Sequence, residues 1–136
     1  METRPKEIDE KDAETLKTIN GRYPTIDDCV IEVWCEPEQT QIEGNASAID
    51  DDTDKEIADN IGKELEYGND WAWCTIFVKV EWNEFSGMDT LCCCSYKSRN
   101  DFIRANDYYQ DMKGEAYRAM CEYIDEVRTR LSYLDV

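Results

Sequence analysis

The sequence predicts an α+β fold with a sheet of about four strands, antiparallel or mixed, and helices packed on one face. Two strand-like stretches, Cys29–Glu36 and Trp71–Trp82, alternate residue by residue between the two sides of an extended chain. Two helix-like stretches, Lys55–Glu66 and Asp107–Tyr133, repeat apolar residues at three- and four-residue spacing. The expected order of helix, hairpin, helix, hairpin, helix is typical of α+β proteins.

The chain of 136 residues, 41% of them hydrophobic, has the size of one domain and can bury a core. We expect residues 1–24 to form an N-terminal arm and residues 25–136 to form a single domain. A short helix is predicted for Asp9–Asn20, although Leu16 and Ile19 are its few apolar contacts. Two roles stay open for this arm, a mobile extension or a partner-binding element.

The first hairpin begins with Cys29–Glu36. Proline has no N–H to donate, so Pro37 either ends this strand or marks it as an edge strand. Gln39–Glu43 is predicted as a second, weaker strand. A polar loop follows, and the next helix is expected over Lys55–Glu66, with Thr53 or Asp54 as its N-cap.

The central hairpin is the longest apolar run of the chain. One side of its first strand is apolar throughout and belongs in a core: Ala72, Cys74, Ile76, Val78, Val80 and Trp82. Asn83–Gly87 supplies the turn, and Gly87 is the residue expected to take a positive φ. Met88–Tyr96 then folds back as the second, antiparallel strand.

Two helices are predicted after the hairpin. Ser98–Asp101 has the pattern of a capping box ahead of a short helix that carries Phe102 and Ile103. Asp107–Tyr133 is the long helix, and Gly114 is its weak point. Its core-facing stripe consists of Met112, Ala116, Met120, Tyr123, Ile124, Val127 and Leu131.

Charge is the strongest functional signal. The chain has 32 acidic and 15 basic residues, a net charge of −17, and no histidine. Residues 1–70 carry a net −14, whereas residues 71–136 carry only −3. Such a field repels nucleic acid and anionic membranes and attracts basic protein surfaces, including those that hold DNA or RNA. The alternative is that acidity serves solubility alone.

The seven cysteines do not indicate a disulfide framework, because the number is odd and Cys92–Cys94 are consecutive. An acidic start is the reverse of a secretory leader, so reduced thiols and a cytoplasmic location in the host cell are expected. Neighbouring side chains of a strand alternate faces, which predicts that the three consecutive thiols do not converge on a metal. With no histidine, phosphate loop or nucleophile elbow, we expect no cofactor, no metal and no enzyme activity.

The residues predicted to bind a partner lie in two places. The first is an acidic cluster, and its spacing does not fit a calcium loop: Asp50, Asp51, Asp52, Asp54, Glu56 and Asp59. The second is the pair Trp71 and Trp73, which forms either an aromatic platform for a partner or a second small core.

Five short motifs resemble a family of small phage- and prophage-encoded proteins. They are Gly44-Asn-Ala46, Asp50-Asp-Asp52 ahead of a helix, Gly68-Asn-Asp-Trp-Ala-Trp-Cys74, Cys94-Ser-Tyr-Lys97 and Tyr108-Tyr-Gln-Asp-Met112. The resemblance spans about residues 29–130. It implies a phage origin, and because the family has no assigned activity, it implies no catalytic residues.

By analogy with acidic phage accessory proteins, the leading hypothesis is a stoichiometric inhibitor of a host defence nuclease, an anti-CRISPR or anti-restriction protein. It would occupy a basic nucleic-acid-binding surface by acidic mimicry and would not bind nucleic acid or membrane itself. The alternatives are a sponge for a nucleotide signal, built on Trp71, Trp73, Tyr96 and Lys97 or Arg99, and a phage structural or interaction protein. The sequence leaves homodimerisation open.

Overall fold

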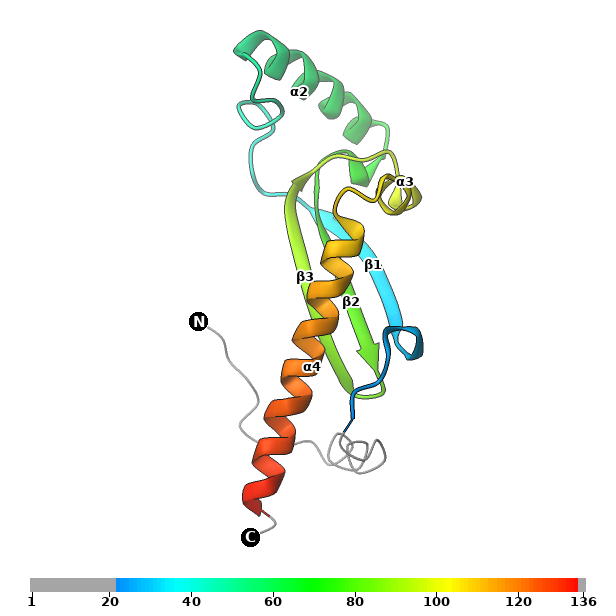
Figure 1. Cartoon of the computed structure of the whole chain (residues 1–136). Helices are drawn as coiled ribbons and strands as arrows, with labels where there is room; N and C mark the ends of the chain where they lie inside the picture. The colour runs from blue at the N-terminus through cyan, green and yellow to red at the C-terminus, as the bar shows by residue number, and fades with distance from the viewer. Residues whose placement is uncertain (1–21, 135–136) are drawn as a thin grey trace. The chain divides into compact units, whose positions relative to one another are not determined.

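The computed structural model describes residues 22–134, and the helix predicted for Asp9–Asn20 lies outside that range. The fold is α+β, as predicted, with a three-stranded antiparallel sheet in the order β1-β2-β3 (Figure 1). The strands are β1 (Val30–Pro37), β2 (Cys74–Trp82) and β3 (Phe85–Cys94), and the helices are α2 (Asp51–Glu66), α3 (Arg99–Ala105) and α4 (Tyr109–Leu134). Within the described range, none of the helices is long and apolar enough to cross a bilayer.

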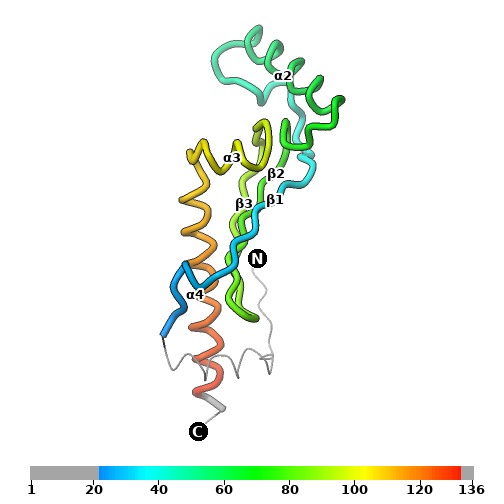
Figure 2. The backbone as a smooth tube through the Cα atoms, turned by 90° about the vertical axis from the view of Figure 1, so that its right-hand side faces the viewer, coloured from blue at the N-terminus to red at the C-terminus, as the bar shows by residue number. Residues whose placement is uncertain are grey.

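Strand β2 lies between β1 and β3 in the sheet, and Figure 2 shows the path of the three strands. The apolar side of β2 is buried, as the alternation predicted. Cys74, Ile76, Val78 and Val80 have no exposed surface. The turn to β3 is tighter than expected, since only two residues separate Trp82 from Phe85. The prediction for its glycine is wrong: Asn83, with φ of 53°, takes the left-handed conformation, and Gly87 lies within β3.

The predicted strand over Gln39–Glu43 does not form, and the described part of the chain has three strands rather than four. The segment turns instead, because the Asn45 N–H donates to the carbonyl of Ile42 at 2.9 Å. The indole Nε1 of Trp73 donates to the carbonyl of Thr40 at 2.7 Å. A side chain therefore takes a carbonyl that a neighbouring strand would otherwise pair.

The chain forms two compact units. Unit 1 contains the described chain up to Glu32, Lys79–Asp89 and the chain from Lys113 onward. Unit 2 contains Val33–Val78 and Thr90–Met112. All three strands contribute one end to each unit.

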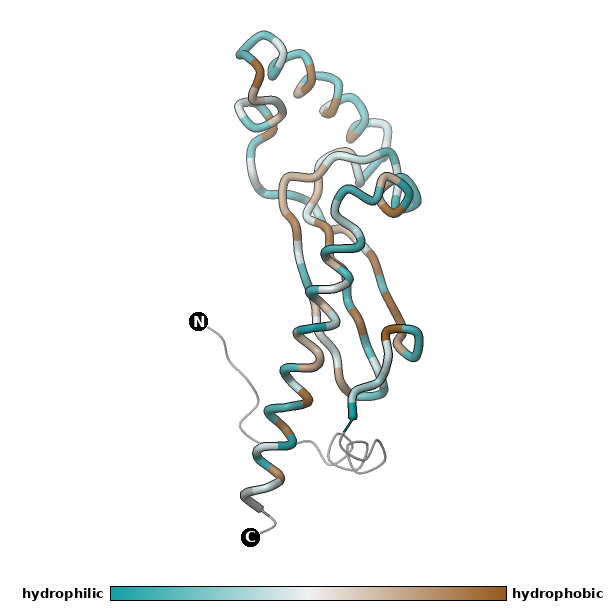
Figure 3. Tube along the Cα trace, viewed as in Figure 1, coloured by the Kyte–Doolittle hydropathy of each residue, from teal (hydrophilic) through white to brown (hydrophobic). Residues whose placement is uncertain are grey.

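In unit 1, α4 packs its predicted stripe against the end of the β2–β3 hairpin. Figure 3 shows the spaced hydrophobic positions along this helix. The buried cluster consists of Val80, Phe85, Ala116, Met120, Ile124 and Val127, with Tyr123 and Leu131 packed against it. Gly87 allows the close approach, since a Cβ there would lie 2.1 Å from the Ala116 carbonyl oxygen.

The chain entering unit 1 is fixed to α4. The Tyr23 hydroxyl donates to both carboxylate oxygens of Asp125, at 2.6 and 2.7 Å. The Tyr117 hydroxyl donates to the carbonyl of Pro24 at 2.8 Å. The guanidinium of Arg128 lies 5.2 Å from the centre of the Tyr23 ring. The end of the predicted arm is thus part of a packed unit.

In unit 2, Ile61 of α2 packs with Ala72 and Trp73, which precede β2. Helix α2 begins at Asp51, earlier than predicted, because the Asp50 side chain accepts the Thr53 N–H and acts as the N-cap. The predicted helix α3 is confirmed. Its buried Phe102 contacts the rings of Trp71, Tyr96 and Tyr109.

Candidate functional site

The exposed face of α2 carries a line of carboxylates. Asp52, Glu56 and Asp59 are spaced by four and three residues, so they share one side of the helix, and all three are exposed. The opposite side is buried through Ala58 and Ile61. At 1.5 Å of rise per residue, the three charges lie about 5 Å apart along the axis.

Asp54, predicted to contact a partner, faces inward and is only 5% exposed. Its carboxylate accepts the backbone N–H groups of Gly44 at 2.5 Å, Ala46 at 2.7 Å and Ser47 at 2.9 Å. These donors, Gly44 first, hold the pKa of the Asp54 carboxyl below its usual range. Asp54 therefore fixes the Gly44–Ser47 loop to α2 and is not available to a partner.

Asp50 also has a structural role, since its Oδ1 accepts the Thr53 N–H at 2.7 Å. This bond lowers the pKa of the Asp50 carboxyl. Asp51 and Asp52 are exposed and, with Glu43 and Lys55, they line a surface hollow of about 410 Å³. The hollow extends the acidic face from α2 onto the preceding loop.

Three apolar side chains on or beside α2 are exposed. Ile49 is 78% exposed before the helix, Tyr67 is 85% exposed after it, and Ile57 is 36% exposed within it. Exposed side chains of this kind offer a partner apolar contact area beside the carboxylates. The acidity of this region predicted that its carboxylates bind a partner, but no sequence pattern predicted that these three apolar side chains are exposed.

The two tryptophans predicted to form a platform have different environments. Trp73 is 5% exposed, packs with Ile61 and donates its indole N–H to Thr40. Trp71 is half-buried and stacks on Phe102 with ring centres 6.3 Å apart. The small-core alternative therefore describes Trp73, whereas Trp71 keeps part of its surface accessible.

A second candidate region lies around the segment from Tyr96 to Arg99. A hollow of about 560 Å³ is lined by Trp34, Trp71, Lys97 and Arg99 among others. The Arg99 guanidinium is anchored there, since its Nε donates to the carbonyl of Val33 at 2.9 Å. Three of the residues proposed for the nucleotide sponge thus share one site, and Trp73 is not among them.

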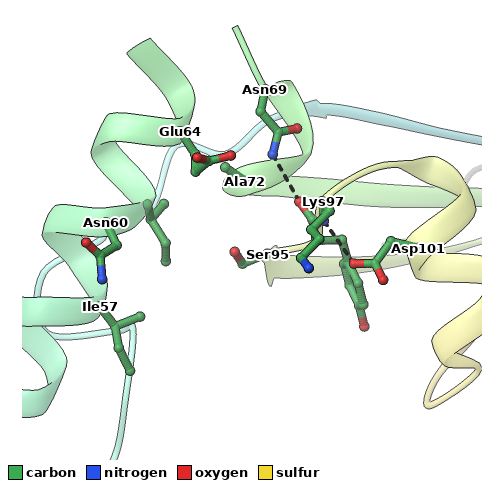
Figure 4. A pocket seen from close by; sticks show the side chains of 10 residues that line it. Ile57, Asn60, Glu64, Asn69, Ala72, Ser95, Lys97 and Asp101 are labelled. Atoms are coloured by element: carbon green, nitrogen blue, oxygen red, sulfur yellow. Dashed lines mark hydrogen bonds between the residues drawn. The ribbon is translucent and has the colours of Figure 1, made fainter. Parts of the chain in front are cut away.

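A larger hollow of about 610 Å³ lies between α2 and this segment (Figure 4). Its polar lining comes from both sides: Asn60, Glu64, Asn69, Ser95, Tyr96, Lys97 and Asp101. The Asn69 side chain donates to the carbonyl of Tyr96 at 3.3 Å, and the Lys97 N–H donates to Asp101 at 2.9 Å. Burial and the bond to Asp107 raise the pKa of the Tyr96 hydroxyl, which therefore remains a neutral donor.

The strand alternation that led us to predict that the three consecutive thiols do not converge fails between Cys92 and Cys93, although Cys94 lies apart from these two. Cys93 has a φ of 58°, which interrupts the strand alternation. As a result, the Sγ atoms of Cys92 and Cys93 and a carboxylate oxygen of Glu38 lie within 4.8 Å of one another. Cys94 is buried, and its thiol donates to the carbonyls of Leu91 and Cys92.

Comparison with known proteins identifies no relative. Family models, curated proteins and solved structures give no significant match to the chain. Any functional conclusion therefore depends on the chemistry of the chain itself.

Proposed function

We propose that the protein is a phage-encoded stoichiometric inhibitor of a bacterial defence nuclease of the CRISPR or restriction type. It binds the basic nucleic-acid-binding surface of its target through the exposed face of α2. The observation that carries the proposal is the exposed line Asp52, Glu56 and Asp59, three carboxylates that are flanked by an exposed lysine, Lys55.

The spacing of this line suits a surface built for phosphates. Its charges are about 5 Å apart along the axis of α2, and each strand of B-DNA carries one phosphate per about 3.4 Å of the DNA axis. A groove that accepts a row of phosphates therefore meets a similar, less dense row of carboxylates. The net charge of −17 adds long-range attraction to a basic target.

The surface around the line of carboxylates adds a hollow and exposed apolar side chains to the proposed binding face. The hollow beside Asp51 and Asp52 offers carboxylates to an arginine or lysine of the target. Exposed Ile49 and Tyr67 add apolar contact area, which charge alone does not provide. The contact residues we propose are thus Asp51, Asp52, Glu56 and Asp59, without the inward-facing Asp54.

The test uses a panel of purified CRISPR effectors and restriction enzymes. Binding of labelled duplex DNA to each enzyme is followed by anisotropy as the protein is added, at low and at high salt. We expect one enzyme to lose its DNA at a one-to-one ratio, with weaker inhibition at high salt.

The decisive variant is Asp52→Asn with Glu56→Gln and Asp59→Asn. At about 0.5–1 kcal/mol for each charge contact, the triple variant should inhibit about 10–100-fold less. The matched control removes three exposed carboxylates of unit 1, Glu84→Gln, Glu115→Gln and Glu122→Gln, and should inhibit normally. Equal inhibition by both triple variants would refute the role of α2.

The second candidate function is the sponge for a nucleotide signal, which the hollow around Trp71, Lys97 and Arg99 favours. An aromatic ring and two cations are the groups that stack a base and pair a phosphate. If the purified protein carries a bound nucleotide, seen by its ultraviolet absorbance, and Arg99→Ala abolishes that absorbance, the sponge hypothesis is supported over the inhibitor hypothesis. Inhibition of no enzyme and no bound nucleotide would leave a phage structural partner as the remaining hypothesis.

A further inference from the structure

At the end of strand β3, two cysteine thiols and a carboxylate that is distant in the sequence lie close together. Successive side chains of a regular strand point to opposite faces. Cys93 departs from this rule because its φ of 58° is left-handed, a conformation that non-glycine residues rarely adopt. One ligand atom from each of Cys92, Cys93 and Glu38 then lies within 4.8 Å of the other two.

Glu38 is held in place by its own hydrogen bonds. Its Oε1 accepts the Thr75 hydroxyl at 2.7 Å and the Cys93 N–H at 2.8 Å. Its Oε2 accepts the Thr40 N–H at 3.0 Å. The donors, Cys93 first, lower the pKa of the Glu38 carboxyl to about 2, so the group is ionised at neutral pH. The same N–H links the carboxylate to the unusual backbone of Cys93.

We propose that Glu38, Cys92 and Cys93 form a binding site for a thiophilic divalent cation of the zinc class. Zinc–sulfur bonds of about 2.3 Å place two ligands of a tetrahedral ion about 3.8 Å apart. Ligand atoms already within 4.8 Å need only side-chain adjustment to reach that geometry. The fourth position of the ion remains for water.

The ligand set selects the class of cation. Two thiolates favour zinc or cadmium over magnesium and calcium, which prefer oxygen ligands. Supporting hydrogen bonds to a ligating carboxylate are the usual surroundings of such sites. Cys92 is exposed, so an ion can reach the site from solvent.

Binding exchanges protons for the ion. A divalent cation binds thiolates and not thiols, so both cysteines must lose their protons as the ion binds. Two thiol protons leave to solvent for each cation bound, and two sulfur–metal bonds form. No electron is transferred.

The experiment titrates the reduced, metal-free full-length protein with cadmium. Two signals are recorded, the ultraviolet thiolate-to-cadmium charge-transfer band and the protons released in weak buffer. We expect one tight site with two protons released per ion. Cys92→Ser and Cys93→Ser should each weaken binding by more than about 100-fold, beyond the range for a supporting residue.

Two further variants test the carboxylate. Glu38→Gln keeps both thiolates and should keep the band while weakening binding about 10–100-fold. Thr75→Val removes only a hydrogen bond to Glu38 and should cause a smaller loss. Far-ultraviolet circular dichroism checks that each variant is folded, and Cys92→Ser changes an exposed side chain, so it remains informative if another variant unfolds.

The control is a second thiol pair of the same unit, Cys35 and Cys74, which belongs to no group of three possible ligands within 4.8 Å of one another among the described residues. Cys35→Ser should leave the band and the affinity unchanged. The proposal is overturned if Cys35→Ser removes the band, if Cys92→Ser retains full affinity, or if the wild type binds no cadmium under reducing conditions.

Discussion

Replacing Gly87 by alanine tests how α4 packs on the hairpin. A Cβ on Gly87 would lie 2.1 Å from the Ala116 carbonyl oxygen and 2.4 Å from the Met120 nitrogen. Both are backbone atoms of a helix, so neither can rotate away. The helix must therefore retreat by about 0.9 Å to reach even the 3.0 Å that real Cβ atoms keep.

The cost follows from what that shift separates. A gap of 0.5–1 Å forfeits about a quarter to a half of the dispersion energy of each contact. The contacts at risk join Val80 and Phe85 to Ala116, Met120 and Ile124. Overpacking typically costs about 1–3 kcal/mol, and because backbone is involved we expect the upper end, about 3 kcal/mol. At about 4 °C per kcal/mol, Gly87→Ala should lower Tm by about 12 °C.

Gly114→Ala is the matched control. Gly114 lies within α4 on its exposed side, and a Cβ there would meet nothing within 4 Å. Alanine is better than glycine inside a helix by about 1 kcal/mol, so Tm should rise by about 4 °C. Thermal unfolding by circular dichroism measures both. A Tm for Gly87→Ala at or above wild type would refute the close packing of α4 on β3.

Three further outcomes are expected. Asp54→Asn should lower the urea midpoint, because the loop N–H groups lose a charged acceptor, whereas Asp51→Asn should leave it unchanged. The pKa of the Glu38 carboxyl is about 2 when folded and about 4.3 when unfolded. Its contribution to stability is therefore present above about pH 4.3 and lost as the pH falls toward 2, and Glu38→Gln should flatten that part of the urea-midpoint profile. Iodoacetamide should modify exposed Cys92 first and spare Cys74, because Cys74 is buried and burial raises the pKa of its thiol. Mass spectrometry of timed samples measures the alkylation of both cysteines, and early alkylation of Cys74 would contradict its burial.

Most of the fold could be predicted because its main elements carry their own periodicity. Strand β2 alternates over its whole length, and the stripe of α4 repeats over more than five turns, so both were found to within three residues at their ends. The acidic face of α2 was predicted for the same reason, since helical spacing places Asp52, Glu56 and Asp59 together.

The candidate site was predicted less well, because composition does not say which way a side chain points. Asp54 stands among four acidic neighbours in the sequence, yet it alone turns inward to three backbone N–H groups. Trp73 and Trp71 look equivalent in the motif W-A-W-C, but only Trp73 finds a carbonyl, that of Thr40, to satisfy its indole in a core.

The fold class, the central hairpin, the long helix and the sign of the charge could all be predicted, because each depends on local pattern or on composition alone. Only the folded chain shows that Asn83, and not Gly87, takes the left-handed conformation of the turn. The same holds for the absence of a strand over Gln39–Glu43 and for the pair of thiols that lie together. Cys93 is the clearest case, since its left-handed backbone is accompanied by a bond from its N–H to Glu38, 55 residues away. A contact of that separation leaves no periodic trace in the sequence, and only the folded chain brings its groups together.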